Sequence, residues 1–322
     1  MRPFGYARPT TLAEATRLVA ERGVPMGGGT DLIGVMKAGW SPATVVDLTG
    51  VAGLGGWERA KGRGLRIGAV ARLADLEADD RLARSLPIVR AALRDAATQQ
   101  LRNAGTLGGN LLQANRCWYY RDPAIPCWHK GGKRCFAVEG DSRLHAILGD
   151  SPCHMVAPSD LAPALIACDA VAELRSTGRA RRVLLASLYR EPAEGARREH
   201  ALRPGEVLVG VRVPEAMLGR RAAFLKQMER KAWSFAVVSV AATARVRAGR
   251  LHDARVVLGG VAAIPWRVPA AEALLEGRAP DRAATDAAAD LILAGSVPMK
   301  DNAHKLALAR VLVRRALASL VT

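Results

Sequence analysis

The chain has 322 residues, half of them hydrophobic, which is long enough for two domains with separate cores and too apolar for a disordered protein. No apolar run reaches the roughly 18 uncharged residues that a membrane-spanning helix needs, and the first residues lack the apolar stretch of a secretory signal. The 47 Lys and Arg outnumber the 30 Asp and Glu, but they are scattered along the sequence. We therefore expect no membrane insertion and no nucleic-acid partner; a solvated basic surface, or a face for an acidic partner subunit, fits better.

The first third of the chain alternates between helical and extended patterns. Thr11 followed by Glu14 forms a capping-box pattern and predicts a helix that ends near Gly23. The elements expected after it are an extended step, a glycine-rich turn, a helix, two strands and another helix, at residues 24–26, 27–31, 32–36, 45–48, 65–69 and 88–97. This order predicts an α/β region.

The second half of the chain contains longer apolar strands and a helical tail. Residues 187–205 hold Pro, Gly and many charges, as an exposed connection does, and we place a domain boundary near Pro214. Two strands are expected beyond it, joined by a hairpin at Gly249 and Arg250, and then three helices, at residues 236–246, 255–261, 270–275, 283–293 and 304–320. The predicted fold class is α+β, with a two-part α/β domain followed by a smaller α+β domain with an antiparallel sheet and helices, at residues 1–214 (subdomains 1–55 and 56–214) and 215–322.

Two glycine-rich turns are candidate cofactor contacts. A backbone approaches a pyrophosphate closely only where side chains are absent, and residues 27–31 meet that requirement. This turn alone also fits an ordinary tight turn, and it matches neither the GxGxxG spacing nor a Walker loop. In the second turn, residues 103–110, Thr106 and Asn110 flank two glycines and offer a hydroxyl and an amide to a ligand. Two such turns roughly 80 residues apart predict one long dinucleotide.

Four of the five cysteines lie within 37 residues, which predicts a metal site. Nine, seven and seventeen residues separate Cys117, Cys127, Cys135 and Cys153, a spacing that suits a wrapping loop. Four thiolates are what an iron-sulfur cluster needs. A structural zinc is the alternative, because three histidines lie among these cysteines, His129, His145 and His154. The fifth thiol, Cys168, sits in an apolar stretch and is expected in the core.

The motifs together resemble the FAD-binding subunit of the xanthine dehydrogenase and carbon monoxide dehydrogenase family. The resemblance spans nearly the whole chain and is carried by residues 28–32, 101–103, 106–110, 158–161, 204–208, 224–227, 259–261 and 265–267. It implies a vanillyl-alcohol-oxidase-like FAD domain at residues 1–214 and a CO dehydrogenase flavoprotein-like domain at residues 215–322.

The resemblance also implies which residues contact FAD. The first turn would wrap the pyrophosphate with Pro25, Met26, Gly27, Gly28, Gly29, Thr30, Asp31 and Leu32. In the second turn, the groups that hold phosphate or ribitol would be Thr106, Gly109 and Asn110. Asp160 would accept a hydrogen bond from a polar cofactor group, and Leu208 and Lys226 would touch FAD. A cation near the flavin stabilises its reduced form, although Lys226 also fits a solvent-facing strand lysine.

The cysteine loop, residues 115–155, resembles an insertion found in one branch of this family. That branch contains the flavin subunits of 4-hydroxybenzoyl-CoA reductase and of the periplasmic aldehyde oxidoreductase, and residues 115–117 and 142–146 are closer to the latter. The likeness implies a four-iron four-sulfur cluster bound by Cys117, Cys127, Cys135 and Cys153.

These likenesses imply an oxidoreductase subunit that relays electrons between iron-sulfur clusters, FAD and an external acceptor. The implied partners are a large molybdenum-cofactor subunit and a small two-iron two-sulfur subunit. The open alternatives are a reductase-like or xanthine dehydrogenase-like complex, a flavin oxidase acting alone, and a zinc-stapled scaffold without redox activity. No catalytic residue is expected, and the remaining histidines are assigned to the surface or core, His200, His252 and His304. The expected compartment is the cytoplasm, with export of the folded complex to the periplasm as the alternative.

Overall fold

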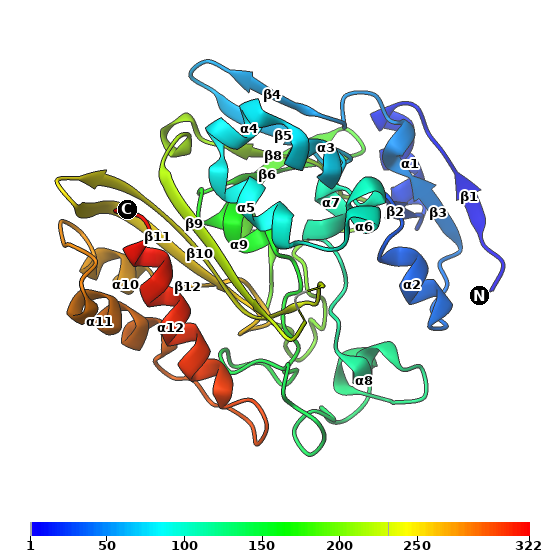
Figure 1. The fold of residues 1–322 in the computed structure, drawn as a ribbon. Coiled ribbons are helices and arrows are strands. Elements are labelled where there is room, and N and C mark those ends of the chain that lie inside the picture. The colour runs from blue at the N-terminus through cyan, green and yellow to red at the C-terminus, as the bar shows by residue number, and fades with distance from the viewer. Residues whose placement is uncertain (1, 231) are drawn as a thin grey trace.

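The computed structural model describes residues 2–230 and 232–322, whose strands form three sheets (Figure 1). The first sheet is parallel, with the strand order β1-β3-β2. The N-terminal part of the chain that forms this sheet contains, in order, β1, α1, β2, α2 and β3, at Gly5–Ala7, Leu12–Ala20, Val24–Met26, Leu32–Lys37 and Thr44–Asp47. The hydroxyl of Thr11 accepts a hydrogen bond from the amide of Glu14 and caps α1, as predicted. The glycine-rich turn lies between β2 and α2.

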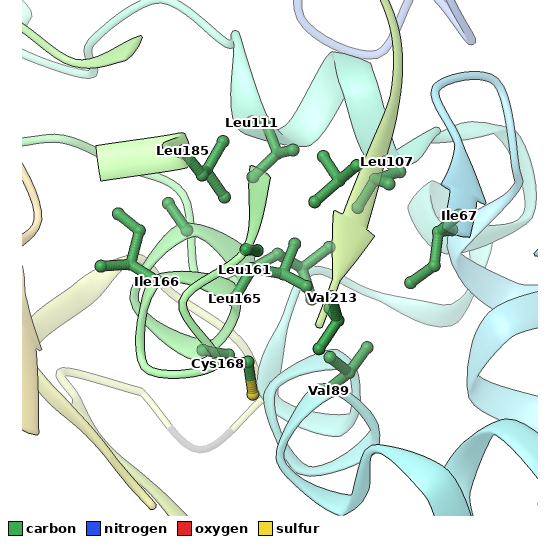
Figure 2. Close-up of a cluster of buried hydrophobic side chains, with 14 of the residues drawn as sticks. Ile67, Val89, Leu107, Leu111, Leu161, Leu165, Ile166, Cys168, Leu185 and Val213 are labelled. Atoms are coloured by element: carbon green, nitrogen blue, oxygen red, sulfur yellow. The ribbon is translucent and has the colours of Figure 1, made fainter. Parts of the chain in front are cut away.

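The second sheet is antiparallel and has the order β4-β5-β8-β6-β7. Its strands are Trp57–Ala60, Gly64–Gly68, Val207–Val213, Val171–Ser176 and Arg179–Leu184. The helices of this region are α3 to α7 and α9, at Leu73–Ala78, Asp80–Ser85, Pro87–Asp95, Gln99–Ala104, Leu107–Leu111 and Leu161–Ile166. Apolar side chains of these helices and strands form one buried cluster (Figure 2). Cys168 is buried in this cluster, which confirms the prediction that it is a core residue.

The second glycine-rich segment differs from its prediction, because most of it is helical. Residue 104 ends α6 and residue 107 begins α7, so only Gly105 and Thr106 connect the two helices. The hydroxyl of Thr106 accepts from the amide of Gly109 at 3.2 Å and caps α7. Local capping therefore turns a predicted loop into the start of a helix.

The third sheet is antiparallel, with the order β12-β11-β10-β9. In chain order, β9 to β12 span Arg221–Met228, Ala236–Arg247, Arg250–Gly259 and Trp266–Arg267. The helices α10 to α12 follow at Pro269–Leu274, Arg282–Leu293 and His304–Ala318. The predicted hairpin is present, and its turn consists of Ala248 and Gly249, both with positive φ. The strand after it begins at Arg250, five residues before the predicted start. The predicted order of an α/β region followed by an antiparallel sheet with helices is confirmed.

The C-terminal sheet is covered on both faces, which joins the two halves of the chain. α10 and α12 contact one face, while α5 and α9 from the preceding region contact β9, β10 and β11. The segment between α7 and α9 contains the short helix α8, Trp118–Arg121, which lies apart from the three sheets in Figure 1. This segment carries Cys117, Cys127, Cys135 and Cys153. Among the described residues, no helix is long and apolar enough to cross a membrane.

Candidate functional site: paired glycine turns beside a cysteine cavity

The two glycine turns pack directly against each other. A Cβ atom at Gly27 would collide with the hydroxyl of Thr106, and one at Gly28 would overlap the carbonyl oxygen of Ala104. Gly29 has φ +72°, a backbone conformation that side-chain-bearing residues rarely adopt. The bare backbone is therefore required by the contact between the turns as well as by any ligand.

A cavity of about 360 Å³ opens beside the first turn, which is the size range of a cofactor pocket. Its lining includes most of the residues predicted to bind FAD, namely Pro25, Met26, Gly27, Gly28, Gly29, Thr30, Asp31, Leu32, Gly109 and Leu208. Sequence reasoning missed several other lining residues, which come from distant segments, Trp40, Gln113, Tyr120, His200 and Leu202. Trp40 is 48% exposed. A single tryptophan next to a glycine was the one local feature of the sequence that could have indicated a residue of this lining. His200 is largely buried against Tyr189, which fits its predicted place at the surface or in the core, and it also lines this cavity.

A second cavity of about 100 Å³ shares four lining residues with the first, Thr30, Asp31, Gly109 and Gln113. It brings in the remaining polar candidates of the second turn, Thr106 and Asn110, and also Asp160. The Asn110 side-chain oxygen accepts a hydrogen bond from the Ser159 hydroxyl at 2.7 Å, so this amide is already oriented by the protein.

Asp160 and Lys226 form a buried ion pair at the edge of this cavity. The Lys226 ammonium lies 2.8 Å from the carboxylate and also donates to the carbonyl of Asp95 at 2.9 Å. Its side chain is 0% exposed, so the solvent-facing alternative for Lys226 was wrong. Burial raises the pKa of Asp160 to about 6, while the ammonium opposes this rise. Contact of either residue with FAD stays a prediction.

Asp31 connects the first glycine turn to the cysteine loop. Its carboxylate accepts from the amide of Ala114 at 2.7 Å and from Arg121 at 2.9 Å, and it pairs with Arg116 at 3.0 Å. These three partners flank Cys117 in the sequence. The cofactor turn and the cysteine loop therefore share one carboxylate as their common anchor.

The four predicted ligand cysteines line one small cavity. The cavity wall also holds aromatic side chains and a methionine, Tyr119, Tyr120, Trp128, His129, Phe136 and Met155. Burial raises the pKa of Cys117 to about 11 and of Cys153 to about 12, and the neighbouring thiols add to the rise. Deprotonated thiols here therefore need bound positive charge, which a metal supplies.

No preformed metal site is found at the cysteine loop among the described residues. Within residues 2–230 and 232–322, no three His, Cys, Asp or Glu side chains gather closely enough to hold one metal ion. A single zinc draws its sulfur ligands to about 2.3 Å from one point.

Two of the three histidines proposed as zinc ligands have protein partners. The Nε2 atom of His129 lies 3.3 Å from a carboxylate oxygen of Glu199, which also accepts from Asn115. The Nε2 atom of His145 lies 3.2 Å from the sulfur of Cys117. Burial and the charge of Lys305 lower the pKa of His145 to about 4, so this ring is neutral.

Lys305, at the start of α12, is a fully buried cation bound by two carbonyl groups. Its ammonium donates to the carbonyl oxygens of His145 and Gly260 at 2.7 and 2.8 Å. Burial lowers its pKa to about 7, whereas a lysine in an unfolded chain titrates at about 10.4. Between these values the unfolded chain binds more protons than the folded one, so raising the pH favours folding.

We expect the stability of the wild type to rise relative to Lys305→Met as the pH increases from 7 to 10. The slope of the difference is at most about 1.4 kcal/mol per pH unit. Urea unfolding of both proteins, at matched cofactor content and several pH values, measures it. Parallel stability profiles would show that the buried amine keeps its ordinary pKa.

The fold and these cavities are those expected of a flavoprotein with a dinucleotide site. Residues 2–216 match the family described as the FAD-binding domain in molybdopterin dehydrogenase, and residues 223–320 match the CO dehydrogenase flavoprotein C-terminal domain. The chain belongs to the family of FAD-binding medium subunits of molybdenum hydroxylases, as its motifs predicted.

Individual relatives cover the full length of the chain. The aldehyde oxidoreductase FAD-binding subunit PaoB of Escherichia coli is 40% identical over 329 aligned positions, covering 100% of this chain and 98% of the relative. The carbon monoxide dehydrogenase medium chain of Afipia carboxidovorans is 29% identical, covering 97% and 95%. The solved CO dehydrogenase of Oligotropha carboxidovorans superposes with a TM-score of 0.79 at 26% identity, covering 100% and 99%. The chain is thus an oxidoreductase subunit of this class.

Proposed function

We propose that this chain is the electron-transferring flavin subunit of an aldehyde oxidoreductase-type molybdenum hydroxylase and that it carries its own iron-sulfur cluster. The observation that carries this proposal is the pairing of two sites. Two bare glycine turns meet beside a cofactor-sized cavity, and Asp31 ties them to a loop whose four cysteines line a second cavity.

FAD would occupy the two adjoining cavities, with its pyrophosphate against the first glycine turn. The first turn lines the larger cavity, so its backbone amides would provide the donors for phosphate oxygens. Bound FAD supplies two-electron and one-electron transfer. The protein residues hold it in place, and the buried Asp160–Lys226 pair supplies fixed charges at the edge of the site.

The cluster is proposed to be a four-iron four-sulfur cluster bound by Cys117, Cys127, Cys135 and Cys153. The donor set supports this assignment, because four thiols and mostly apolar or aromatic neighbours enclose one cavity. The zinc-scaffold alternative is less well supported, since His129 is paired with Glu199 and not with a cysteine.

The proposed partners are a large molybdenum-cofactor subunit and a small two-iron two-sulfur subunit. The net charge of +17 provides a basic surface for acidic faces on such partners. An aldehyde is the proposed substrate class of the complex, because the 40% identical relative is named as an aldehyde oxidoreductase subunit. We also propose the domain division near Pro214, between the end of β8 and the start of β9. The cytoplasm remains the predicted compartment and the periplasm its alternative, to be decided by cell fractionation.

The test is the visible spectrum and composition of the full chain purified under anaerobic conditions. The expected result is flavin absorption over a broad iron-sulfur band, both bleached by dithionite, with about four iron and four sulfide per chain. Protein that stays colourless after incubation with FAD, iron and sulfide would overturn the proposal. One zinc per chain, with no iron, would support the scaffold alternative.

A further inference from the structure

A buried histidine contacts the sulfur of one proposed cluster ligand. The Nε2 atom of His145 lies 3.2 Å from the Cys117 sulfur, within hydrogen-bonding distance for a sulfur acceptor. His145 is buried, with 3% of the residue exposed. Its ring packs edge-on against that of Trp118, and the ring centroids lie 5.0 Å apart. Tyr119 lies against it as well, at 5.8 Å. The imidazole is thus confined between aromatic rings and aimed at the thiol.

The unpartnered second ring nitrogen indicates which atom carries the proton. The Nδ1 atom of His145 is buried and has no hydrogen-bond partner among the described residues. If the proton were on Nδ1, that N–H group would be buried without an acceptor. The lone pair of Nε2 would then point at the lone pairs of the sulfur, and the two would repel each other. A proton on Nε2 instead lets the ring donate to the sulfur, which avoids both costs.

The backbone of His145 is held by the C-terminal part of the chain. Its carbonyl accepts from the Lys305 ammonium at 2.7 Å and from the Asn302 amide at 3.3 Å, both close to the start of α12. Its amide donates to the carbonyl of Ser142 at 2.9 Å. The donor is therefore fixed in position from a part of the molecule that contains none of the proposed ligands.

We propose that His145 donates an N–H···S hydrogen bond to Cys117 that raises the reduction potential of the cluster. This inference rests on the proposed function, because it requires the cluster. Reduction adds one electron and makes the ligand sulfurs more negative, so a fixed N–H dipole aimed at one sulfur stabilises the reduced form more than the oxidised form. The electron comes from the reductant, no covalent bond breaks, and the proton stays on His145.

The experiment compares the midpoint potential of the cluster in the reconstituted full chain and two variants. His145→Phe keeps an aromatic ring among Trp118 and Tyr119 but removes the donor, and His145→Gln keeps an N–H donor. We expect His145→Phe to retain its iron and to favour the oxidised form about tenfold more, a drop of about 59 mV for one electron. His145→Gln is expected to recover part of this drop.

A spectroscopic readout and a matched control separate this effect from structural damage. Electron-nuclear double resonance of the reduced wild type should detect a strongly coupled proton that exchanges in heavy water and is lost in His145→Phe. His154→Phe is the control, because His154 follows Cys153 in the sequence and no hydrogen bond from its ring to a sulfur is found among the described residues.

Each outcome bears on one proposal. A wild-type potential in His145→Phe, or the absence of an exchangeable coupled proton in the reduced wild type, would overturn the role of His145. An equal drop in His154→Phe would do so too, since it would show a general disturbance of the loop. A wild-type chain that binds no iron would instead overturn the proposed cluster. If only His145→Phe loses its iron, its potential cannot be measured. The potential of His145→Gln and the exchangeable proton of the wild type then decide the role of His145.

Discussion

Gly28→Ala is expected to abolish FAD binding, with a loss of affinity of at least about a hundredfold. The added Cβ would overlap the carbonyl oxygen of Ala104, and neither partner is a flexible side chain. The two turns would have to separate, which displaces backbone amides from the pyrophosphate position. A hundredfold loss corresponds to about 2.7 kcal/mol, comparable to losing one or two hydrogen bonds to a charged group. Titration of the apo chain with FAD, followed by flavin fluorescence, measures the effect.

Gly34→Ala provides the matched control for this variant. Gly34 lies in the neighbouring helix α2, is exposed, and has open space where its Cβ would be. This variant should bind FAD normally. Because alanine favours the helical state over glycine by about 1 kcal/mol, its midpoint of thermal unfolding should be slightly higher than that of the wild type. Wild-type affinity in Gly28→Ala would contradict the assignment of the first turn to the pyrophosphate. Equal losses in both variants would place the effect in the general stability of this region.

Cys153→Ser is expected to lose nearly all of its iron and sulfide, from about four of each per chain. Serine cannot replace the soft thiolate that completes the ligand set, and Cys153 lines the cavity together with the other three cysteines. FAD should remain bound, because none of the first-turn residues is changed. Iron and sulfide analysis, together with the flavin-to-protein ratio, checks both parts of this expectation.

Cys168→Ala is the control, because Cys168 is buried among apolar residues outside that cavity. It should keep its full iron content and lose about 1 kcal/mol of stability through the small cavity it creates. A full complement of iron in Cys153→Ser, or equal iron loss in both variants, would argue against the four-cysteine assignment. Loss of FAD together with iron in Cys153→Ser would show that Asp31 couples the two sites more tightly than proposed.

Much of the fold could be predicted because its signals are local. The capping pair Thr11 and Glu14 lies within one helical turn, and the hairpin at residue 249 is set by two adjacent residues with positive φ. The long C-terminal strands were indicated by nearly continuous apolar runs, and the helices after them by periodic apolar residues. The main error, at residues 103–110, has a local cause as well. Capping by Thr106 begins a helix that the glycines alone did not indicate.

The amino-acid sequence by itself determined the family, the two glycine turns and the set of four cysteines, because each is defined by residue types at short spacing. Only the tertiary structure decided which distant groups meet them. His200 lines the cofactor cavity, Asp31 bridges to Arg121, and His145 contacts Cys117. These partners are separated by 28 residues or more along the chain. Their meeting depends on how the sheets and the irregular loop pack, and no local pattern of hydrogen bonding or hydrophobicity encodes that packing.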